Sequence, residues 1–189
     1  MADRYLIATG TWDASTTSIW SATDGGASGA SVPTAADNVY FTGTPGNITV
    51  TVSGTRVCRS INCTGATGTL TGTSTPQLSI GDGTSGASNI AFKFVSGMTL
   101  SGSITLNLIN SSGTVQECYS GGKTLSAITC NHASGKWKQM DNITMDNSFT
   151  MTAGSGSTAW DMNTFTLTLS GGGTTFAGGG KTYSALVSM

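Results

Sequence analysis

The segment Gly-Gly-Lys-Thr-Leu-Ser-Ala-Ile at residues 121–128 returns almost unchanged at residues 179–186, as Gly-Gly-Lys-Thr-Tyr-Ser-Ala-Leu. Each copy joins a glycine turn to a short strand in which polar and apolar residues alternate. The copies are too far apart for one coil of a solenoid, and their separation fits two or three coils of about 20–29 residues each. The near-repeat therefore predicts strands stacked as successive coils, and it argues against an enzyme core.

The composition is that of a strand-rich chain with few charges. Of 189 residues, 27 are glycine and only 9% are charged, well below the usual share of about a quarter. Hydrophobic residues make up 37%, which is enough when each strand buries only one face. With a net charge of −1, nothing in the composition predicts binding to nucleic acid or to an anionic membrane.

Targeting and membrane signals are missing from the sequence. No apolar run reaches the roughly 18 residues that a transmembrane helix needs. A secretory signal begins with a basic segment that is followed by an apolar segment. Residues 1–5 do not form such a basic segment, and no apolar segment of this kind follows them. We therefore expect neither a membrane span nor a cleaved leader.

The chain divides into an N-terminal module at residues 1–46 and a strand-repeat region at residues 47–189. The module holds Trp12 and Trp20, which we interpret as core anchors of a cap, with stacking on a carbohydrate as the alternative. Pro33 fixes the entry of a segment that predicts a short helical or irregular turn followed by a strand, with Val39 and Phe41 on one face of that strand.

From residue 47 onward, short strands follow one another with turn residues between them. Thr recurs on the polar side of these strands, where a β-branched side chain fits a pleated surface. No stretch shows the 3.6-residue periodicity of a helix. The clearest strands are expected at residues 48–52, 78–80, 90–94, 100–108, 143–145, 149–151 and 165–169.

The predicted fold class is all-β, and two architectures fit it. The first is a short β-solenoid, similar to a right-handed β-helix, with an N-terminal cap; the alternative is a β-sandwich or jelly roll. A solenoid should carry rows of Ile, Val, Leu, Met and Phe inside, and Thr and Ser outside. The last segment contains Tyr183, Leu186 and Val187 without a charge or a proline, so we expect it to pack on another copy or on a larger structure.

Four cysteines leave two main interpretations open: buried free thiols, or disulfides within or between chains. A metal site is a weaker alternative, because the sequence has one histidine, His132, and no Cys-X-X-Cys pair. The candidate residues are Cys58, Cys63, Cys118 and Cys130.

Catalytic residues are hard to assemble from this sequence. Asp141, Asp146 and Asp161 could meet on neighbouring coils, as in solenoid enzymes that degrade polysaccharides, but two of them begin Asp-Asn turn pairs. Trp137 lies between two lysines, which predicts either a basic-aromatic patch for a sugar or a base, or a plain exposed strand. We therefore expect no enzyme, no metal and no cofactor.

The N-terminal stretch resembles the opening module of tailed-bacteriophage virion proteins, which are β-helical fibre-like or decoration proteins. The later Thr-rich segments, such as residues 122–125 and 161–167, are similar to coils of the same proteins and of bacterial adhesins. The resemblance covers essentially the whole chain and implies neither a cofactor nor a catalytic residue. Its motifs are Asp3-Arg4-Tyr5, Gly10-Thr11-Trp12, Ile19-Trp20-Ser21, Gly25-Gly26-Ala27 and the run at residues 32–41.

The resemblance predicts a structural and binding protein of the virion that decorates or stabilises the capsid or tail surface through contacts with other virion proteins. One alternative is a short tail-fibre or receptor-binding protein that recognises host glycans; another is a solenoid polysaccharide hydrolase or lyase. We also expect a homo-oligomer, with a trimer as the first expectation. No nucleic-acid or membrane partner is expected.

Overall fold

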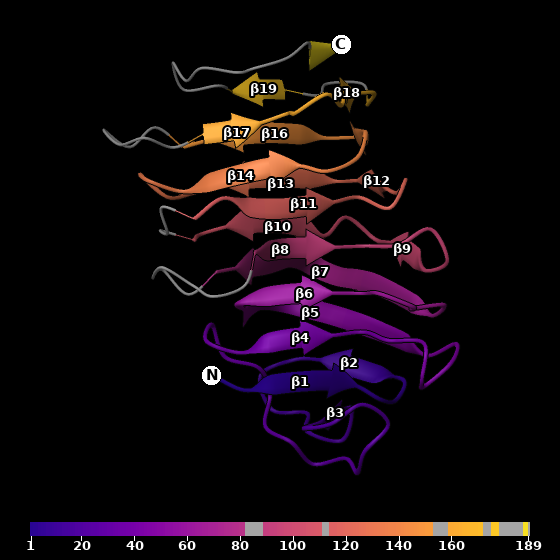
Figure 1. The fold of residues 1–189 in the computed structure, drawn as a ribbon. Coiled ribbons are helices and arrows are strands. Elements are labelled where there is room, and N and C mark those ends of the chain that lie inside the picture. Colours follow the sequence, from indigo (N-terminus) through magenta and orange to yellow (C-terminus); the bar gives the residue numbers. More distant parts are fainter. Residues whose placement is uncertain (82–88, 111–113, 153–158, 172–174, 178–186, 189) are drawn as a thin grey trace.

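The computed structural model describes residues 1–81, 89–110, 114–152, 159–171, 175–177 and 187–188, and these contain strands and turns but no helix. The prediction of an all-β chain is confirmed. The strands form three sheets. Successive strands are stacked from the N-terminal end of the chain, at the bottom of Figure 1, to the C-terminal end, at the top.

The first sheet has eight strands and includes the N-terminal strand of the chain. Among the described strands, every pairing in the molecule is parallel except that of β3 with β1. In spatial order the strands are β3 (Trp20–Ser21), β1 (Asp3–Leu6), β4 (Asn38–Tyr40), β6 (Ser60–Asn62), β8 (Ile90–Lys93), β11 (Gln116–Tyr119), β14 (Lys136–Gln139) and β17 (Ala159–Asp161).

The second sheet also has eight strands and the third has four. The second runs through β2 (Gly10–Trp12), β5 (Thr49–Cys58), β7 (Thr69–Ile80), β10 (Thr105–Leu108), β13 (Ala127–Cys130), β16 (Ser148–Met151) and β19 (Thr175–Ala177), with β9 (Thr99–Ser101) beside β7. The third consists of β12 (Thr124–Leu125), β15 (Ile143–Met145), β18 (Leu167–Leu169) and β20 (Val187–Ser188).

The chain passes through the sheets in a repeating order. It runs β11–β12–β13, then β14–β15–β16, then β17–β18–β19, and each strand pairs with its counterpart in the next passage. Like residues are thereby stacked: Trp137 pairs with Trp160, and Thr144 pairs with Thr168. One such passage through the first, third and second sheets is called a circuit below.

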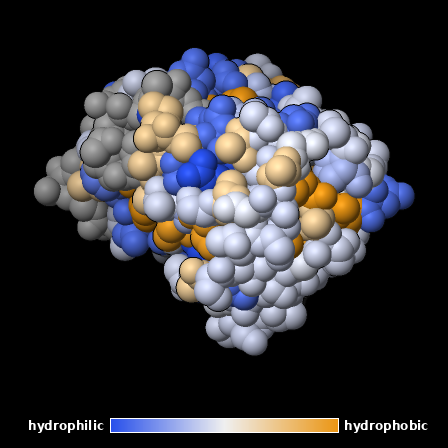
Figure 2. Space-filling view, turned by 90° about the horizontal axis from the view of Figure 1, so that it is seen from below, coloured by the Kyte–Doolittle hydropathy of each residue, from blue (hydrophilic) through white to orange (hydrophobic). Residues whose placement is uncertain are grey.

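The outer faces of the sheets carry hydroxyl side chains more than charged ones. Thr124, Thr144 and Thr168 form one outward row, and Thr51, Thr71 and Ser101 form another. The end of the stack seen in Figure 2 is mostly white or pale blue, as expected for Ser, Thr and Gly, with small hydrophobic patches.

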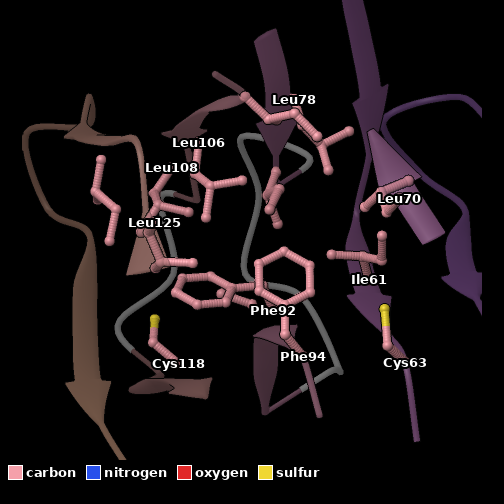
Figure 3. Packing of buried hydrophobic residues seen from close by; sticks show 14 of the residues in the cluster. Ile61, Cys63, Leu70, Leu78, Phe92, Phe94, Leu106, Leu108, Cys118 and Leu125 are labelled. Carbon is pink, nitrogen blue, oxygen red and sulfur yellow. The ribbon is translucent and has the colours of Figure 1, made fainter. Parts of the chain in front are cut away.

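The interior is apolar, as the alternation of each strand predicts. Phe92 and Phe94 lie at its centre with ring centroids 5.4 Å apart, between leucines of the facing strands (Figure 3). Residues in register repeat the same character from strand to strand. One row holds Val39, Ile61, Phe92 and Cys118, and another holds Leu78, Leu106, Ile128 and Phe149.

The single strand predicted at residues 100–108 is wrong, because a corner at Gly102 divides it into β9 and β10. Gly102 has φ of 67°, a conformation that favours glycine. A Cβ at this position would lie 2.5 Å from the carbonyl oxygen of Gly72, so the corner also packs too closely for a side chain. Alternation alone does not show such a corner, since the pattern resumes in phase after it.

The near-repeat and the observed register have different spacings. The first copy forms the turn at Gly121 and Gly122, β12 and the start of β13. Pairing carries Thr124 to Thr144, then to Thr168, then to Ser188. The second copy, with Tyr183 and Leu186, lies outside the described residues. The residue that follows it, Val187, lies in β20 and pairs with Leu167 of β18.

The N-terminal module shares its sheets with the rest of the chain. Val39 pairs with Ile61, and Trp12 pairs with Val52, so two sheets cross the boundary predicted at residue 46. The antiparallel strand β3 and its flanking loops lie at the bottom of the stack in Figure 1. Val39 and Phe41 are both fully buried, which confirms the predicted face of that strand.

Candidate functional site

The stacking of circuits is interrupted between β9 and β12. Strand β9 pairs with β7, and β12 pairs with β15, but no ladder joins β9 to β12 in the described part of the chain. The strands that follow them, β10 and β13, do pair, with Leu106 opposite Ile128. Within the described ranges, the two neighbouring circuits are therefore bonded through β8–β11 and through β10–β13, but not between β9 and β12.

A hollow of about 250 Å³ lies at this interruption. Its floor is apolar and comes from Phe94, Ile104 and Leu106, all of which are buried. Its two rims are Ser101 to Ser103, at the end of β9, and Thr124 to Ser126, around β12. We name this site the β9–β12 groove.

A second hollow of about 360 Å³ adjoins the first and shares Ser103 and Ser126 with it. It lies where β7 bends, beside Ser74 and Thr75. These two residues have φ of 56° and 51°, which is uncommon for residues other than glycine. Strained backbone of this kind is concentrated at functional sites, and here it borders the second hollow.

Backbone groups of both strand edges face the β9–β12 groove. The N–H of Thr99 donates to the carbonyl oxygen of Gly68 at 2.9 Å, so the parallel ladder directs the N–H and C=O of the next residue, Leu100, to the opposite edge. On the other side, the carbonyl oxygen of Leu125 accepts from the N–H of Asp146 at 3.0 Å. The same alternation directs the backbone groups of Thr124 away from β15 and toward the groove.

The groove carries one negative charge. Asp146 is the only ionisable residue among the described residues that line the two hollows, and its side chain is exposed. Lys123 lies close to β12 in the chain, but its Nζ donates to the carbonyl oxygen of Ser96 at 2.8 Å. The groove therefore combines an apolar floor, hydroxyl rims, open backbone edges and a single carboxylate.

The tryptophans predicted as surface or anchoring candidates are all inside the molecule. Trp12 and Trp20 are fully buried and meet edge to face, with centroids 5.1 Å apart and an interplanar angle of 79°. This bears out the core-anchor interpretation and removes both rings from any carbohydrate.

The prediction of a basic-aromatic patch at Trp137 is wrong. Trp137 is 1% exposed, and only its neighbours Lys136 and Lys138 reach the surface. A strand turns successive side chains to opposite faces, so a ring between two partly exposed lysines on the outer face must point inward. It lies in register with Trp160, whose ring packs edge to face on Phe149.

Tyr5, Tyr40 and Tyr119 are partly exposed aromatic residues on the first sheet, and none of them was predicted as a binding residue. Tyr5 and Tyr40 are in register and stack at 4.9 Å, and the Lys93 Nζ lies 5.2 Å from the Tyr119 ring centroid. Burial raises the pKa of Tyr5 and Tyr40, and the nearby Asp3 carboxylate raises it further. The sequence shows a tyrosine in Asp3-Arg4-Tyr5 and another in Asn38-Val39-Tyr40. Only the pairing of their strands shows that the two rings stack on each other.

The four cysteines are free thiols, so the disulfide interpretation does not describe this structure. All four are fully buried, and burial raises the pKa of each thiol. Cys63 and Cys118 lie on opposite sides of the phenylalanine pair in Figure 3. No group of three His, Cys, Asp or Glu side chains suited to a metal ion occurs in the described residues.

The three aspartates considered for catalysis occupy separate places. Asp141 accepts from the backbone N–H groups of Ser120 at 2.9 Å and Gly121 at 2.7 Å, and so holds a turn. Asp161 lies on the first sheet opposite Lys138, and Asp146 lies at the groove. The turn interpretation therefore holds for Asp141, and the structure does not bring the three carboxylates together on one sheet.

Comparisons of this chain with protein-family models, with curated protein sequences and with solved structures find no match. Within the described ranges, no helix has the length and apolar character needed to cross a membrane.

Proposed function

We propose that this chain is a structural protein of a bacteriophage particle, which decorates or stabilises the capsid or tail surface through protein–protein contacts. In this proposal the chain is a short β-solenoid with an N-terminal cap. Repeated passage through the three sheets, with counterpart strands paired in parallel, supports the solenoid. Sandwiches and jelly rolls are built of antiparallel sheets, whereas here only one pairing among the described strands, that of β3 with β1, is antiparallel.

The observation that carries the contact function is the β9–β12 groove. There, two strand edges are unpaired in the described part of the chain, beside a hollow whose floor is formed by buried apolar side chains. An open strand edge is a template for pairing with another chain. A charge-poor, hydroxyl-covered surface also suits close packing on a protein lattice, because few charges must lose their hydration on contact.

Rebinding of purified protein to phage particles tests this proposal. Particles produced without the chain should bind it saturably and carry it through a density gradient. They should also gain resistance to heat or to chelation, as expected of a ligand that binds only the assembled state. Saturable binding to host cells, with none to the particles, would contradict the proposal.

One observation favours the glycan-binding alternative as a second candidate. The hollow at the bend of β7 is rimmed by hydroxyl groups and by the amide of Asn147, next to the carboxylate of Asp146. Such groups fix the orientation of polar ligands in concave sites. A panel of host surface glycans, measured against the purified protein, separates this candidate from the first.

A further inference from the structure

We propose that the β9–β12 groove binds an extended peptide segment of a partner protein, which adds as a parallel strand between β9 and β12. The inference rests on the proposed protein-contact function and names the site and the chemistry of the contact. It joins the interrupted ladder into one series, β7–β9–peptide–β12–β15.

The backbone is the first reason for a peptide occupant. Leu100 on one edge and Thr124 on the other direct their N–H and C=O groups into the same gap, as derived above from the bonds of Thr99 and Leu125. No bond joins β9 to β12 in the described residues, and the hollow lies between them, so neither edge is occupied by the other.

The floor of the groove sets the side-chain requirement. In an added strand, alternate residues face the interior, and the hollow of about 250 Å³ offers that side an apolar surface of Phe94, Ile104 and Leu106. The residues on either side of an inward apolar residue would lie along the hydroxyl rims. Main-chain bonds supply affinity in such strand addition, and the pocket for alternate side chains supplies specificity.

Charge sets the second requirement. Asp146 is exposed, and no side-chain hydrogen bond or ion pair engages it in the described part of the chain. A lysine or arginine beside the inward apolar residue would complement this carboxylate. The expected segment is therefore short and extended, apolar at alternate positions, and basic rather than acidic.

A carbohydrate fits the first hollow less well. Sugars are commonly held by stacking on an exposed aromatic face, and Phe94, the one aromatic residue among the described residues of this lining, is 2% exposed. A sugar would also leave the row of backbone groups on β9 and β12 without partners that match the strand repeat.

The test uses the whole chain and a set of labelled hexapeptides with valine or leucine at alternate positions and one lysine, read by fluorescence anisotropy. A matched peptide with N-methylated alternate amides keeps the side chains and loses the backbone donors. We expect N-methylation to weaken binding about tenfold or more, since it removes several main-chain hydrogen bonds. Equal binding of the methylated peptide, or no binding by any member of the set, would overturn the proposal.

Two variants locate the site. Asp146→Lys should weaken the lysine peptide several-fold and favour the same peptide with glutamate in place of lysine. Ser103→Trp should fill the point shared by both hollows and abolish binding. Because the Ser103 side chain is exposed, the variant should fold normally, and its circular dichroism spectrum should match that of the unsubstituted protein. Binding that is unchanged in both variants places the peptide elsewhere and refutes the site.

Amide hydrogen exchange reads the backbone contact directly. On peptide binding, the amides of Leu100 and Thr124 should exchange more slowly, while that of Thr168, inside the third sheet, should not change. Protection by a neutral oligosaccharide such as maltohexaose, with none by the peptides, would instead assign the groove to a glycan.

The failure of this inference and that of the proposed function are distinguishable. If Ser103→Trp still binds particles saturably, the groove is not the contact site, while the particle function stands. If the peptides bind the groove but the protein does not bind particles, the peptide site stands and the virion function fails.

Discussion

Replacing Trp12 by alanine tests whether the N-terminal module is held by its aromatic pair. The ring is fully buried, pairs through its strand with Val52 and packs edge to face on Trp20. A buried tryptophan removes about 150–250 Å² from water, which corresponds to about 4–6 kcal/mol at ~25 cal/mol per Å². Truncation of large aromatic residues in cores costs about 3–5 kcal/mol, so we expect a loss of about 4 kcal/mol.

Urea unfolding followed by far-ultraviolet circular dichroism measures this loss. Trp12→Phe is the matched control: it keeps an aromatic ring and removes an indole N–H that has no hydrogen-bond partner in the described structure. We expect it to cost about half as much or less. Thr11→Ala, on the outward side of the same strand, should change the free energy of unfolding by less than about 1 kcal/mol. A loss below about 1 kcal/mol for Trp12→Ala would refute the anchoring role.

Three further predictions concern backbone geometry, thiol ionisation and assembly. Gly102→Ala should lower the free energy of unfolding by about 2–3 kcal/mol, because the added Cβ would meet the backbone of Gly72. The control Gly122→Ala, at a positive φ but with open space around it, should cost about 1 kcal/mol. Equal costs in urea unfolding would exclude the close contact. Burial raises the pKa of all four thiols in the folded state. Below the ordinary thiol pKa of about 8.5, the thiols keep their protons in both the folded and the unfolded chain. Above it, the unfolded chain loses these protons first. Stability should therefore fall as pH rises above about 9, by up to about 1.4 kcal/mol per pH unit for each thiol; unfolding curves that coincide from pH 8 to 10.5 would contradict this. Light scattering at tens of micromolar should show a closed homo-oligomer, a trimer being the first expectation, and a clean monomer would rule out self-association.

The alternation of polar and apolar residues was enough to predict the interior of this fold. Val39 with Phe41 and Ile143 with Met145 lie on buried faces as expected, because one-sided burial fixes a period of two. The error at Trp137 came from giving weight to its flanking lysines, although the same alternation already directed the ring inward.

The groove could not be predicted in the same way. It depends on which strands fail to pair, and that follows from the corner at Gly102 and from the register of β10 with β13. Neither leaves a local mark in the sequence, since Ser and Thr line the groove and also cover the rest of the surface. The tyrosine stack on the first sheet was missed for the same reason: Tyr5 and Tyr40 are neighbours only through strand pairing.

The protein composition of purified phage particles is the most direct test of the central claim that this chain works on a virion surface. Quantitative mass spectrometry of gradient-purified particles should find the chain at a fixed copy number relative to the major capsid or tail protein, unchanged by high-salt washing. An integer ratio that matches a capsid or tail symmetry would identify the structure that carries it. A chain that is absent from the particles, or that is removed by washing to a trace with no fixed ratio, would contradict the account.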